Sequence, residues 1–421
     1  LILLLLVLLA AGVPISFTVG IVATVGLIGL LGPARGITSI VQMHYHLWND
    51  FSYTCLPLFI FLGHLMHRSE LGKELFHFAR LWVGHLPGGL AVATLVACAI
   101  FAAMSGSTVA NAAVVGLVAI SQMVAYKYDR RMAAGLVAAG GTLGILIPPS
   151  NAMVLIGIAA EESIGHLFMA EVVPGILAFL VLSAAAVLIC KRTGAYEPLP
   201  RASWKERLAG TREALGCLAI PVIILGGIYS GVFTPTEAAG VAVAYVLVFV
   251  LLTRRVSPAK MADILTDSGK TVAMFAILVP AAIALGNVAA MLQVPQAATE
   301  YIAAAGWPGW AVILGTMVLI LIMGCFLDGP TIVLLTIPTL APVIRALGYD
   351  MLWYAVLVVL NTEIGLLTPP VGMNLFVIQQ VSGVDLPDVV RGTIPFILVL
   401  LVVLVIVALF PSLSLWLPRM M

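Results

Sequence analysis

Two short polar interruptions inside long apolar stretches carry the side chains best suited to hold an ion or an anionic solute. The first is Ser105-Gly-Ser107, and the second is Asp328-Gly-Pro-Thr331. An acid at the centre of a bilayer costs about 2.5–3.5 kcal/mol on insertion scales, so an acid found at that depth is a functional candidate by default. We therefore predict that Ser105, Ser107 and Asp328 contact a transported solute.

Each of these residues also has a plainer structural interpretation. Asp328 followed by Gly-Pro suits the N-cap of a helix that begins at Pro330. Ser105 and Ser107 are small enough to be packing residues between helices. We favour the functional interpretation because the two interruptions lie in opposite halves of the chain and would face each other as a pair.

A Pro-Pro pair follows each interruption and predicts a break in a second apolar stretch. Pro148-Pro149 and Pro369-Pro370 each remove two amide donors, so a continuous helix cannot form there. The carbonyls freed at such breaks suit a small cation such as Na⁺, and half-helix N-termini attract an anion. The nearby oxygen donors are Thr142, Gly144, Ser150 and Asn151 in the first half, and Thr362, Gly365, Thr368, Gly372 and Asn374 in the second. Glu363 suits an ion contact and a structural hydrogen bond equally.

The elements that must position these residues are helices in a membrane. Of the 421 residues, 62% are hydrophobic and only 9% are charged, with a mean hydropathy of +1.16. A soluble domain has about 45–50% apolar and about 25% charged residues, so the composition excludes a cytosolic enzyme and a disordered chain. The net charge of +1 leaves no electrostatic footprint for nucleic acid. The five scattered cysteines form no disulfide framework.

Seven apolar runs are candidate membrane spans, and we expect about ten to twelve crossings in all. The runs are Ile15–Leu31, Tyr53–Met66, Gly175–Ile189, Leu215–Tyr229, Ala238–Leu252, Thr271–Leu292 and Ile394–Leu409. Basic residues cluster at 68–80, 127–131, 191–212 and 254–270, and cytoplasmic loops collect Lys and Arg, so we place these loops inside. Leu1–Leu9 has neither a basic start nor a small-residue cleavage site, so we do not interpret it as a removable signal.

The apolar arms around each interruption predict a re-entrant hairpin, and each Pro-Pro pair predicts a broken helix. The hairpins lie at about 88–126 and 309–347, and the broken helices at about 132–160 and 352–380. Irregular backbone at membrane depth is tolerated only inside protein or against a water-filled cavity. The two hairpin tips, which enter from opposite faces, therefore predict a binding site where they meet.

The two halves of the chain repeat each other. Pro14 and Pro235, like Pro148 and Pro369, are 221 positions apart, and Gly106 and Gly329 are 223 apart, as are Pro57 and Pro280. A basic residue follows the run at 53–66 but precedes its counterpart at 271–292, so the repeats have opposite orientations. We predict an all-α polytopic membrane protein of two inverted repeats, 1–192 and 214–421. A cytoplasmic connector at 193–213, with a short interfacial helix, joins them.

The seven histidines all precede position 167 and are the main argument for an alternative, an intramembrane enzyme. His44-x-His46 and His64-x-x-His67 have spacings that could hold a metal. They lie beside aromatic and basic residues, so we interpret them as interfacial anchors. Gly106-Ser107 resembles a fragment of a membrane serine hydrolase, but no histidine is suitably placed on a nearby helix. We expect neither enzyme activity nor an organic cofactor.

Five segments resemble the large membrane subunit of the tripartite ATP-independent periplasmic (TRAP) transporters. They are Met104-Ser-Gly-Ser-Thr-Val-Ala-Asn111, Gly144–Asn151, Phe233-Thr-Pro-Thr-Glu-Ala-Ala239, Asp328-Gly-Pro-Thr331 and Gly365–Asn374. The resemblance implies an elevator-type, Na⁺-coupled importer in a bacterial inner membrane, in which the two hairpins move against a scaffold containing 15–31 and 215–252. It also implies a four-helix membrane subunit and a periplasmic binding protein that delivers a carboxylate-bearing solute.

The resemblance also assigns candidate ligands for two Na⁺ ions. They are Ser105, Asn111, Gly144, Pro149, Asn151, Asp328, Thr331, Gly365, Thr368, Met373 and Asn374. A stand-alone Na⁺/carboxylate symporter of similar fold is the main alternative, and a channel is disfavoured because broken helices around a central site are typical of alternating access. The sequence does not identify the organic acid, the number of ions per cycle or the oligomeric state.

Overall fold

The computed structural model describes residues 1–69, 71–194 and 196–420, and over these residues it is all-helical. The α-helices are α1 (Ile2–Ala10), α2 (Ile15–Leu31), α3 (Pro33–Trp48), α4 (Cys55–Arg68), α5 (Gly72–Val83), α6 (Gly89–Ser105), α7 (Thr108–Ala125), α8 (Arg130–Leu146), α9 (Asn151–Ala160), α10 (Ile164–Thr193), α11 (Trp204–Tyr229), α12 (Pro235–Leu252), α13 (Pro258–Met291), α14 (Val294–Ala304), α15 (Gly309–Gly324), α16 (Gly329–Ala346), α17 (Met351–Leu366), α18 (Met373–Ser382), α19 (Leu386–Leu409) and α20 (Ser412–Leu415). Two 3₁₀ turns, η1 (Phe51–Thr54) and η2 (Pro418–Met420), complete the described elements.

Within the described residues, seven helices are long and apolar enough to cross a membrane. The pair α8 and α9, bent by 41° at its break, makes an eighth candidate, and four shorter apolar helices (α2, α6, α15 and α17) accompany them. The predicted fold class, an all-α polytopic membrane protein, is therefore confirmed. The predicted total of ten to twelve crossings stays a prediction.

The helices α11 and α13 are among those that begin earlier than the hydropathy predicts, because polar residues start them. Ser203 and Glu206 form a capping box at the start of α11, so residues 204–213, expected in the connector, are the first turns of this long helix rather than a separate interfacial one. The irregular part of the connector runs over 194–203, of which residue 195 lies outside the described residues. Likewise, α13 begins at Pro258 and not at Thr271, because the Ser257 side chain accepts a hydrogen bond from the Lys260 amide at 3.3 Å.

Both predicted hairpins and both predicted broken helices are present as pairs of helices. Gly106 ends α6 in the left-handed region (φ +58°), and Ser107 caps α7, which makes the first tip. The two halves match in helix length: 17, 18, 17 and 10 residues for α6–α9 against 16, 18, 16 and 10 for α15–α18. The Pro148–Pro149 and Pro369–Pro370 bonds at the two breaks are both cis.

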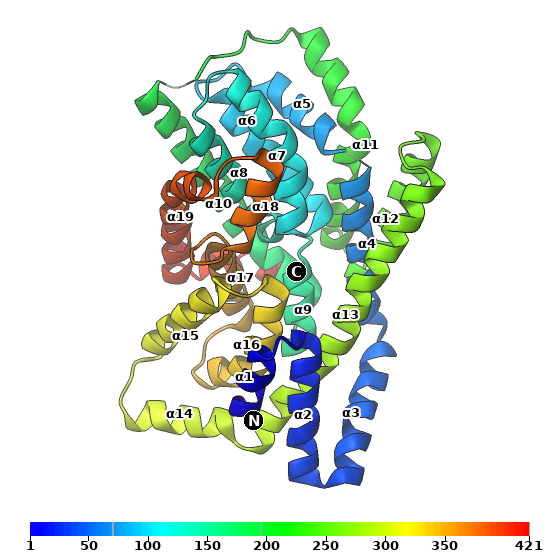
Figure 1. Ribbon diagram of the computed structural model, residues 1–421, viewed down its shortest axis with the longest axis vertical. Coiled ribbons are helices and arrows are strands. Elements are labelled where there is room, and N and C mark those ends of the chain that lie inside the picture. The colour runs from blue at the N-terminus through cyan, green and yellow to red at the C-terminus, as the bar shows by residue number, and fades with distance from the viewer. Residues whose placement is uncertain (70, 195, 421) are drawn as a thin grey trace.

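The two repeats enter the molecule from opposite ends and interlock in its middle. Figure 1 shows α6, α7 and α8, with α18 beside them, in the upper half of the view and α15 and α16 in the lower half, with α9 and α17 between the two groups. The interlocking is reciprocal, since α16 packs against α9 and α18 packs against α7. We call α6–α9 together with α15–α18 the hairpin layer.

A second group of helices lies beside the hairpin layer. In it, α13 packs along α2, while α4 packs against both α12 and α13. Because α4 also contacts α6, α7 and α9, and α13 also contacts α16, these two helices lie between the hairpin layer and the helices α2 and α12. We call α4 and α13 the wall.

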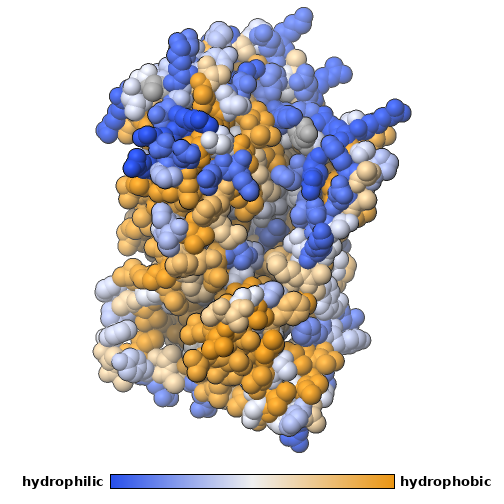
Figure 2. All heavy atoms as spheres, in the orientation of Figure 1, coloured by the Kyte–Doolittle hydropathy of each residue, from blue (hydrophilic) through white to orange (hydrophobic). Residues whose placement is uncertain are grey.

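The polar surface gathers mainly at one end of the molecule. Figure 2 shows hydrophilic residues at the upper end, where Figure 1 places α5 and the start of α11, and apolar residues over much of the middle. The connector between α10 and α11 lies at this upper end, as expected for a cytoplasmic loop. We call this end the basic end.

Candidate functional site

The two hairpin tips and the wall enclose one cavity of about 540 Å³. The first tip contributes residues 105–110 and the second contributes Asp328, Gly329 and Pro330. The starts of α9 and α18 line the same cavity, and α4 and α13 close its other side. A volume of about 300–1,000 Å³ is typical of small-molecule sites. The tips predicted to meet therefore do meet, at a cavity large enough for a small organic solute.

Four helix N-termini converge on this cavity. The first residues of α7, α9, α16 and α18 all line it, and they belong to both repeats. A helix N-terminus presents unpaired amide N–H groups and about half a positive elementary charge. Four such ends around one space make an anion-binding environment without any Lys or Arg.

The three predicted substrate contacts lie together at the tips. The Ser105 side chain is 2% exposed, and its hydroxyl has no hydrogen-bond partner among the described residues. The Ser107 hydroxyl accepts a hydrogen bond from the Ala110 amide at 3.4 Å and so caps α7. Asp328 occupies the N-cap position of α16, but its carboxylate accepts no capping hydrogen bond from this helix. The plainer interpretation, in which the Asp328 side chain caps α16, therefore has no hydrogen bond to support it.

At the first break, backbone oxygens are packed tightly against the first tip. A Cβ atom on Gly106 would lie 2.8 Å from the Pro149 carbonyl oxygen, and one on Gly144 would lie 2.6 Å from the Ser107 carbonyl oxygen. The Asn151 side chain lines the cavity, and its Oδ1 is buried and without a partner in the described part of the chain. Carbonyl and amide oxygens thus gather where the tip meets the broken helix.

The second break repeats this close packing. A Cβ atom on Gly365 would lie 2.6 Å from the Gly324 Cα, so the backbones of α15 and α17 come into direct contact there. The Thr362 hydroxyl is buried without a partner among the residues described, whereas the Thr368 hydroxyl donates to the Ile364 carbonyl at 2.7 Å.

The remaining predicted ligands differ in their position relative to the cavity and in the hydrogen bonds that their side chains make. Met373 and Asn374 line the cavity; the Asn374 amide donates to the Ala138 carbonyl at 3.0 Å, which leaves its Oδ1 unpaired within the described chain. Thr331 is buried in the first turn of α16. Asn111 lies outside the residues that line the cavity. Its side-chain nitrogen lies 3.1–3.4 Å from the carbonyls of Cys98, Gly140 and Gly141, and thereby joins α7 to α6 and α8.

Two buried acids beside the tips were not among the predicted ligands. The Thr108 hydroxyl donates to Glu363 Oε2 at 2.9 Å, a hydrogen bond between α7 of the first repeat and α17 of the second. Glu171 on α10 is 1% exposed and lies close to Ser150 at the first break. An acid inside a 30-residue apolar helix is the sequence signal that would have identified Glu171.

The histidines of α4 also lie elsewhere than expected. His64 and His67, interpreted above as interfacial anchors, line the cavity from the wall. Their position depends on how α4 packs against the hairpin layer, and their spacing in the sequence does not reveal it.

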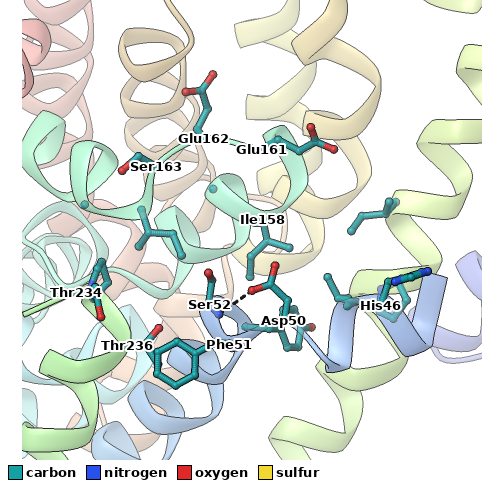
Figure 3. A pocket seen from close by; sticks show the side chains of 18 of the residues that line it. His46, Asp50, Phe51, Ser52, Ile158, Glu161, Glu162, Ser163, Thr234 and Thr236 are labelled. Carbon is teal, nitrogen blue, oxygen red and sulfur yellow. Dashed lines mark hydrogen bonds between the residues drawn. The ribbon is translucent and has the colours of Figure 1, made fainter. Parts of the chain in front are cut away.

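A second hollow of about 720 Å³ is lined by the end of α3, the η1 turn, the end of α9 and the start of α12. Figure 3 shows Asp50 and the η1 turn on one side of it, with the end of α9 and the start of α10 on the other. Of the three acids that line it, Asp50 accepts from the Ser52 amide at 2.8 Å and Glu162 pairs with Arg345 at 2.7 Å, and Glu161 is the third. The helix α13 borders both hollows, this one with Pro280 and Ile283 and the first cavity with Thr271, Met274 and Phe275.

Comparisons with known proteins agree with this architecture. The family model described as the DctM component of the tripartite ATP-independent periplasmic transporters matches residues 2–413. The chain is 40% identical to a C4-dicarboxylate TRAP transporter large permease protein DctM of Pseudomonas aeruginosa, covering 93% of this chain and 91% of that one. It is 36% identical to a sialic acid TRAP transporter large permease protein SiaM of Vibrio cholerae, covering 98% and 96%.

A further relative and one solved structure extend the likeness. An ectoine/5-hydroxyectoine TRAP transporter large permease protein UehC of Ruegeria pomeroyi is 36% identical, with 98% of this chain and 96% of that one covered. The crystal structure of the Alcanivorax borkumensis YdaH transporter superposes with a TM-score of 0.66 at 12% identity, covering 90% of this chain and 89% of that one. At this low sequence identity, the comparison with the YdaH transporter shows a shared fold only.

Proposed function

This chain belongs to the DctM family, the large permease component of tripartite ATP-independent periplasmic transporters, and we propose that it moves an organic acid inward across the membrane, driven by Na⁺. It is a multi-pass membrane transporter subunit and not an enzyme. The observation that carries the proposal is the convergence of four helix N-termini, two serines and Asp328 on one cavity. N–H groups at these N-termini suit a carboxylate, and the neighbouring oxygens suit a small hard cation.

The proposed Na⁺ ions bind where backbone oxygens and unpaired side-chain oxygens gather. The first site uses the first tip and first break, around Ser105, Gly144, Pro149 and Asn151. The second uses Asp328, Thr331, Gly365, Thr368, Met373 and Asn374. Support comes from the buried oxygens of Ser105, Asn151 and Asn374 that have no partner within the described chain, because buried polar atoms are otherwise almost always hydrogen-bonded.

The proposed mechanism is rigid movement of the hairpin layer along the wall. The cavity lies between these two groups of helices, so sliding one past the other would carry the tips from one hollow toward the other. The relatives named for C4-dicarboxylates, sialic acid and ectoine suggest an organic acid or similar small polar solute. We propose the partners implied by the family, a small four-helix membrane subunit and a periplasmic binding protein.

Uptake into proteoliposomes tests the proposal. The chain is reconstituted with both partners, and labelled succinate, N-acetylneuraminate and ectoine are offered under an inward Na⁺ gradient or a matched K⁺ gradient. We expect accumulation of one solute class under the Na⁺ gradient alone. Equal uptake under K⁺ would overturn the coupling to Na⁺, and uptake without the binding protein would indicate a stand-alone symporter.

A further inference from the structure

Two helices lead away from the candidate site side by side. Both α7 and α18 have their first residues among those that line the cavity. A Cβ atom on Gly116 of α7 would lie 3.7 Å from Val381 Cγ1 of α18, and each of these residues lies eight positions past the first residue of its helix. The two helices therefore run parallel and in register, so residues at equal distances from the two helix starts lie level with each other.

Beyond the tips, α7, α18 and α13 line the cavity with apolar side chains, which we call the apolar section. They are Val109 and Ala113 of α7, Val377 and Val381 of α18, and Met274 and Phe275 of α13. Val109 lies one position past the start of α7, and Gln380, the next polar lining residue of α18 after Asn374, lies seven positions past the start of α18. At a rise of about 1.5 Å per residue, the apolar section therefore extends about 9 Å before this polar side chain.

The polar side chains that line the cavity away from the tips supply no fixed positive charge. They are His64 and His67 of α4, Thr271 of α13 and Gln380 of α18. Among the described lining residues there is no Lys and no Arg, and Arg68, which follows His67, binds the Asp267 carboxylate at 2.8 Å. A carboxylate of the solute is therefore best placed at the four helix N-termini, and the rest of the solute then meets the apolar section.

We infer that the cavity prefers a monocarboxylate with an apolar body of up to about seven carbon atoms, the chain that fits about 9 Å when carbon–carbon bonds are about 1.5 Å long. The carboxylate accepts hydrogen bonds from the helix N-termini, and the hydrocarbon body lies along the apolar section. This inference rests on the proposed function, that the cavity binds an organic acid, and it names the class of acid. A hydroxyl or a second carboxylate on the body would be buried against apolar side chains, which costs free energy.

A binding assay that needs neither partner nor gradient tests the inference. A Gln380→Cys reporter is placed in the cavity of the purified full chain, whose five native cysteines are buried, and its rate of labelling by a thiol reagent is measured in Na⁺ buffer. The probes are acetate, butyrate and hexanoate, which lengthen the apolar body by two methylenes at a time. We expect the concentration that halves the labelling rate to fall about fourfold per methylene, as for the burial of a methylene group.

Three further probes separate the parts of the solute. Gluconate has six carbons like hexanoate but a hydroxylated body, and we expect it to protect no better than acetate. Adipate replaces the terminal methyl group of hexanoate by a second carboxylate, and we expect it to protect about tenfold more weakly or worse, because this charge would be buried without a cation. Hexanamide has the apolar body without the negative charge, and it should also protect about tenfold more weakly, as for the loss of a charge-assisted hydrogen bond.

Substitutions in the apolar section link the preference for hexanoate to these residues. Met274→Gln places a polar group of similar length there, and we expect it to reduce the preference for hexanoate over acetate about fourfold or more. Met291→Gln is the matched control, since Met291 lies on the same helix and is 50% exposed against 39% for Met274, but does not line the cavity. Val109→Thr makes the same test on α7, with Val124→Thr as its control, at 44% and 42% exposure.

Four outcomes would overturn the inference. They are equal protection by acetate and hexanoate, protection by gluconate, adipate or hexanamide as strong as by hexanoate, an unchanged preference in both Met274→Gln and Val109→Thr, or protection by none of the acids. The Val109 variant carries the test if the Met274 variant does not fold. Labelled hexanoate is also added to the uptake assay, where we expect it to accumulate. Na⁺-driven uptake of succinate or N-acetylneuraminate instead would overturn the apolar body and keep the transporter, so the two failures are distinguishable.

Discussion

At the scale of single residues, the candidate site is marked by buried oxygens that lack partners. Ser105 Oγ, Asn151 Oδ1, Thr362 Oγ1 and Asn374 Oδ1 are all buried without a hydrogen bond in the described chain, and all lie at the tips or breaks. An unpaired buried oxygen costs about 1–3 kcal/mol, so four of them in one region require an explanation. Coordination of a cation is an explanation that fits the chemistry of these four oxygens and their position in one region.

Asp328 allows a sharp test because the chain contains a matched aspartate. Asp328 and Asp385 both occupy N-cap positions without a capping hydrogen bond, but only Asp328 lines the cavity. We expect Asp328→Asn to lower Na⁺-driven uptake at least tenfold without lowering the melting temperature of the purified chain. The reason is that the change removes the one carboxylate beside the proposed cation.

Asp385→Asn is the control and should transport like the unsubstituted chain. Uptake and the Na⁺ concentration for half-maximal rate are measured for both variants in proteoliposomes. If the two substitutions reduced uptake equally, Asp328 would have no special role at the tip. The second proposed Na⁺ site would then have no acid among its ligands.

Sequence reasoning identified the residues whose position is fixed locally, and it missed those fixed by packing. Ser105, Ser107 and Asp328 interrupt apolar stretches, so their place at the tips follows from their neighbours in the chain. His64 and His67 sit in an ordinary helix, and only the approach of α4 to the tips brings them to the cavity. The Asn111 side-chain nitrogen contacts three carbonyls of α6 and α8, and its Oδ1 is buried without a partner in the described chain, as those of Asn151 and Asn374 are. Its role as an ion ligand stays a prediction.

At the scale of elements, the two repeats are joined through a buried hydrogen bond between α7 and α17. Thr108 is the first residue of α7, directly after the first tip, and its hydroxyl donates to Glu363 Oε2 at 2.9 Å. Both side chains are buried, at 2% and 1% exposure. We infer that this bond fixes the first tip against the broken helix of the other repeat.

Loss of this bond should destabilise the chain. We expect Thr108→Val to cost about 1–3 kcal/mol, because a buried carboxylate oxygen would lose its donor. Thr336→Val is the matched control: Thr336 is also buried, but its hydroxyl donates only to the Ile332 carbonyl of its own helix, at 2.8 Å. Thermal unfolding of the purified variants measures the difference, and equal melting temperatures would show that the contact between α7 and α17 contributes nothing.

The hairpins and broken helices could be predicted because their ends carry local signals. A glycine in the left-handed region ends α6, and proline pairs separate α8 from α9 and α17 from α18. The starts of α11 and α13 could not be predicted from hydropathy, since their first turns are polar and lie outside the apolar runs. Their signals are the caps at Ser203 and Ser257, which hydropathy does not measure.

At the scale of the whole molecule, arginines tie the two repeats into one body. Arg130, at the start of α8, donates to the Ser382 and Gly383 carbonyls at the end of α18, at 3.1 and 2.9 Å. Arg345, near the end of α16, donates to the Ala160 carbonyl at the end of α9 and also pairs with Glu162. Each repeat thus supplies a cation to the C-terminus of the other repeat's broken helix, where the helix dipole favours positive charge.

If this body slides along the wall, contacts between α13 and α16 must differ between states. Gly286 on α13 is one such contact, because a Cβ atom there would lie 2.6 Å from Pro338 Cβ on α16. Gly269 lies on the same helix, and a Cβ atom there would meet nothing within 4 Å. Overpacking costs about 1–3 kcal/mol, so Gly286→Ala should lower the population of the arrangement described here about fivefold or more, relative to one in which α16 has moved.

The measurement is the labelling rate of a cysteine that lines the cavity in this arrangement. Gln380 on α18 lines the cavity. We expect the labelling of Gln380→Cys to slow when Gly286→Ala is added and to stay unchanged when Gly269→Ala is added. Gly286→Ala and Gly269→Ala each add one methyl group to α13, so helix propensity cannot account for a difference in labelling between them. Equal labelling in the two variants would mean that α13 and α16 keep the same contact throughout, and the sliding body would have to be replaced by local opening of the tips.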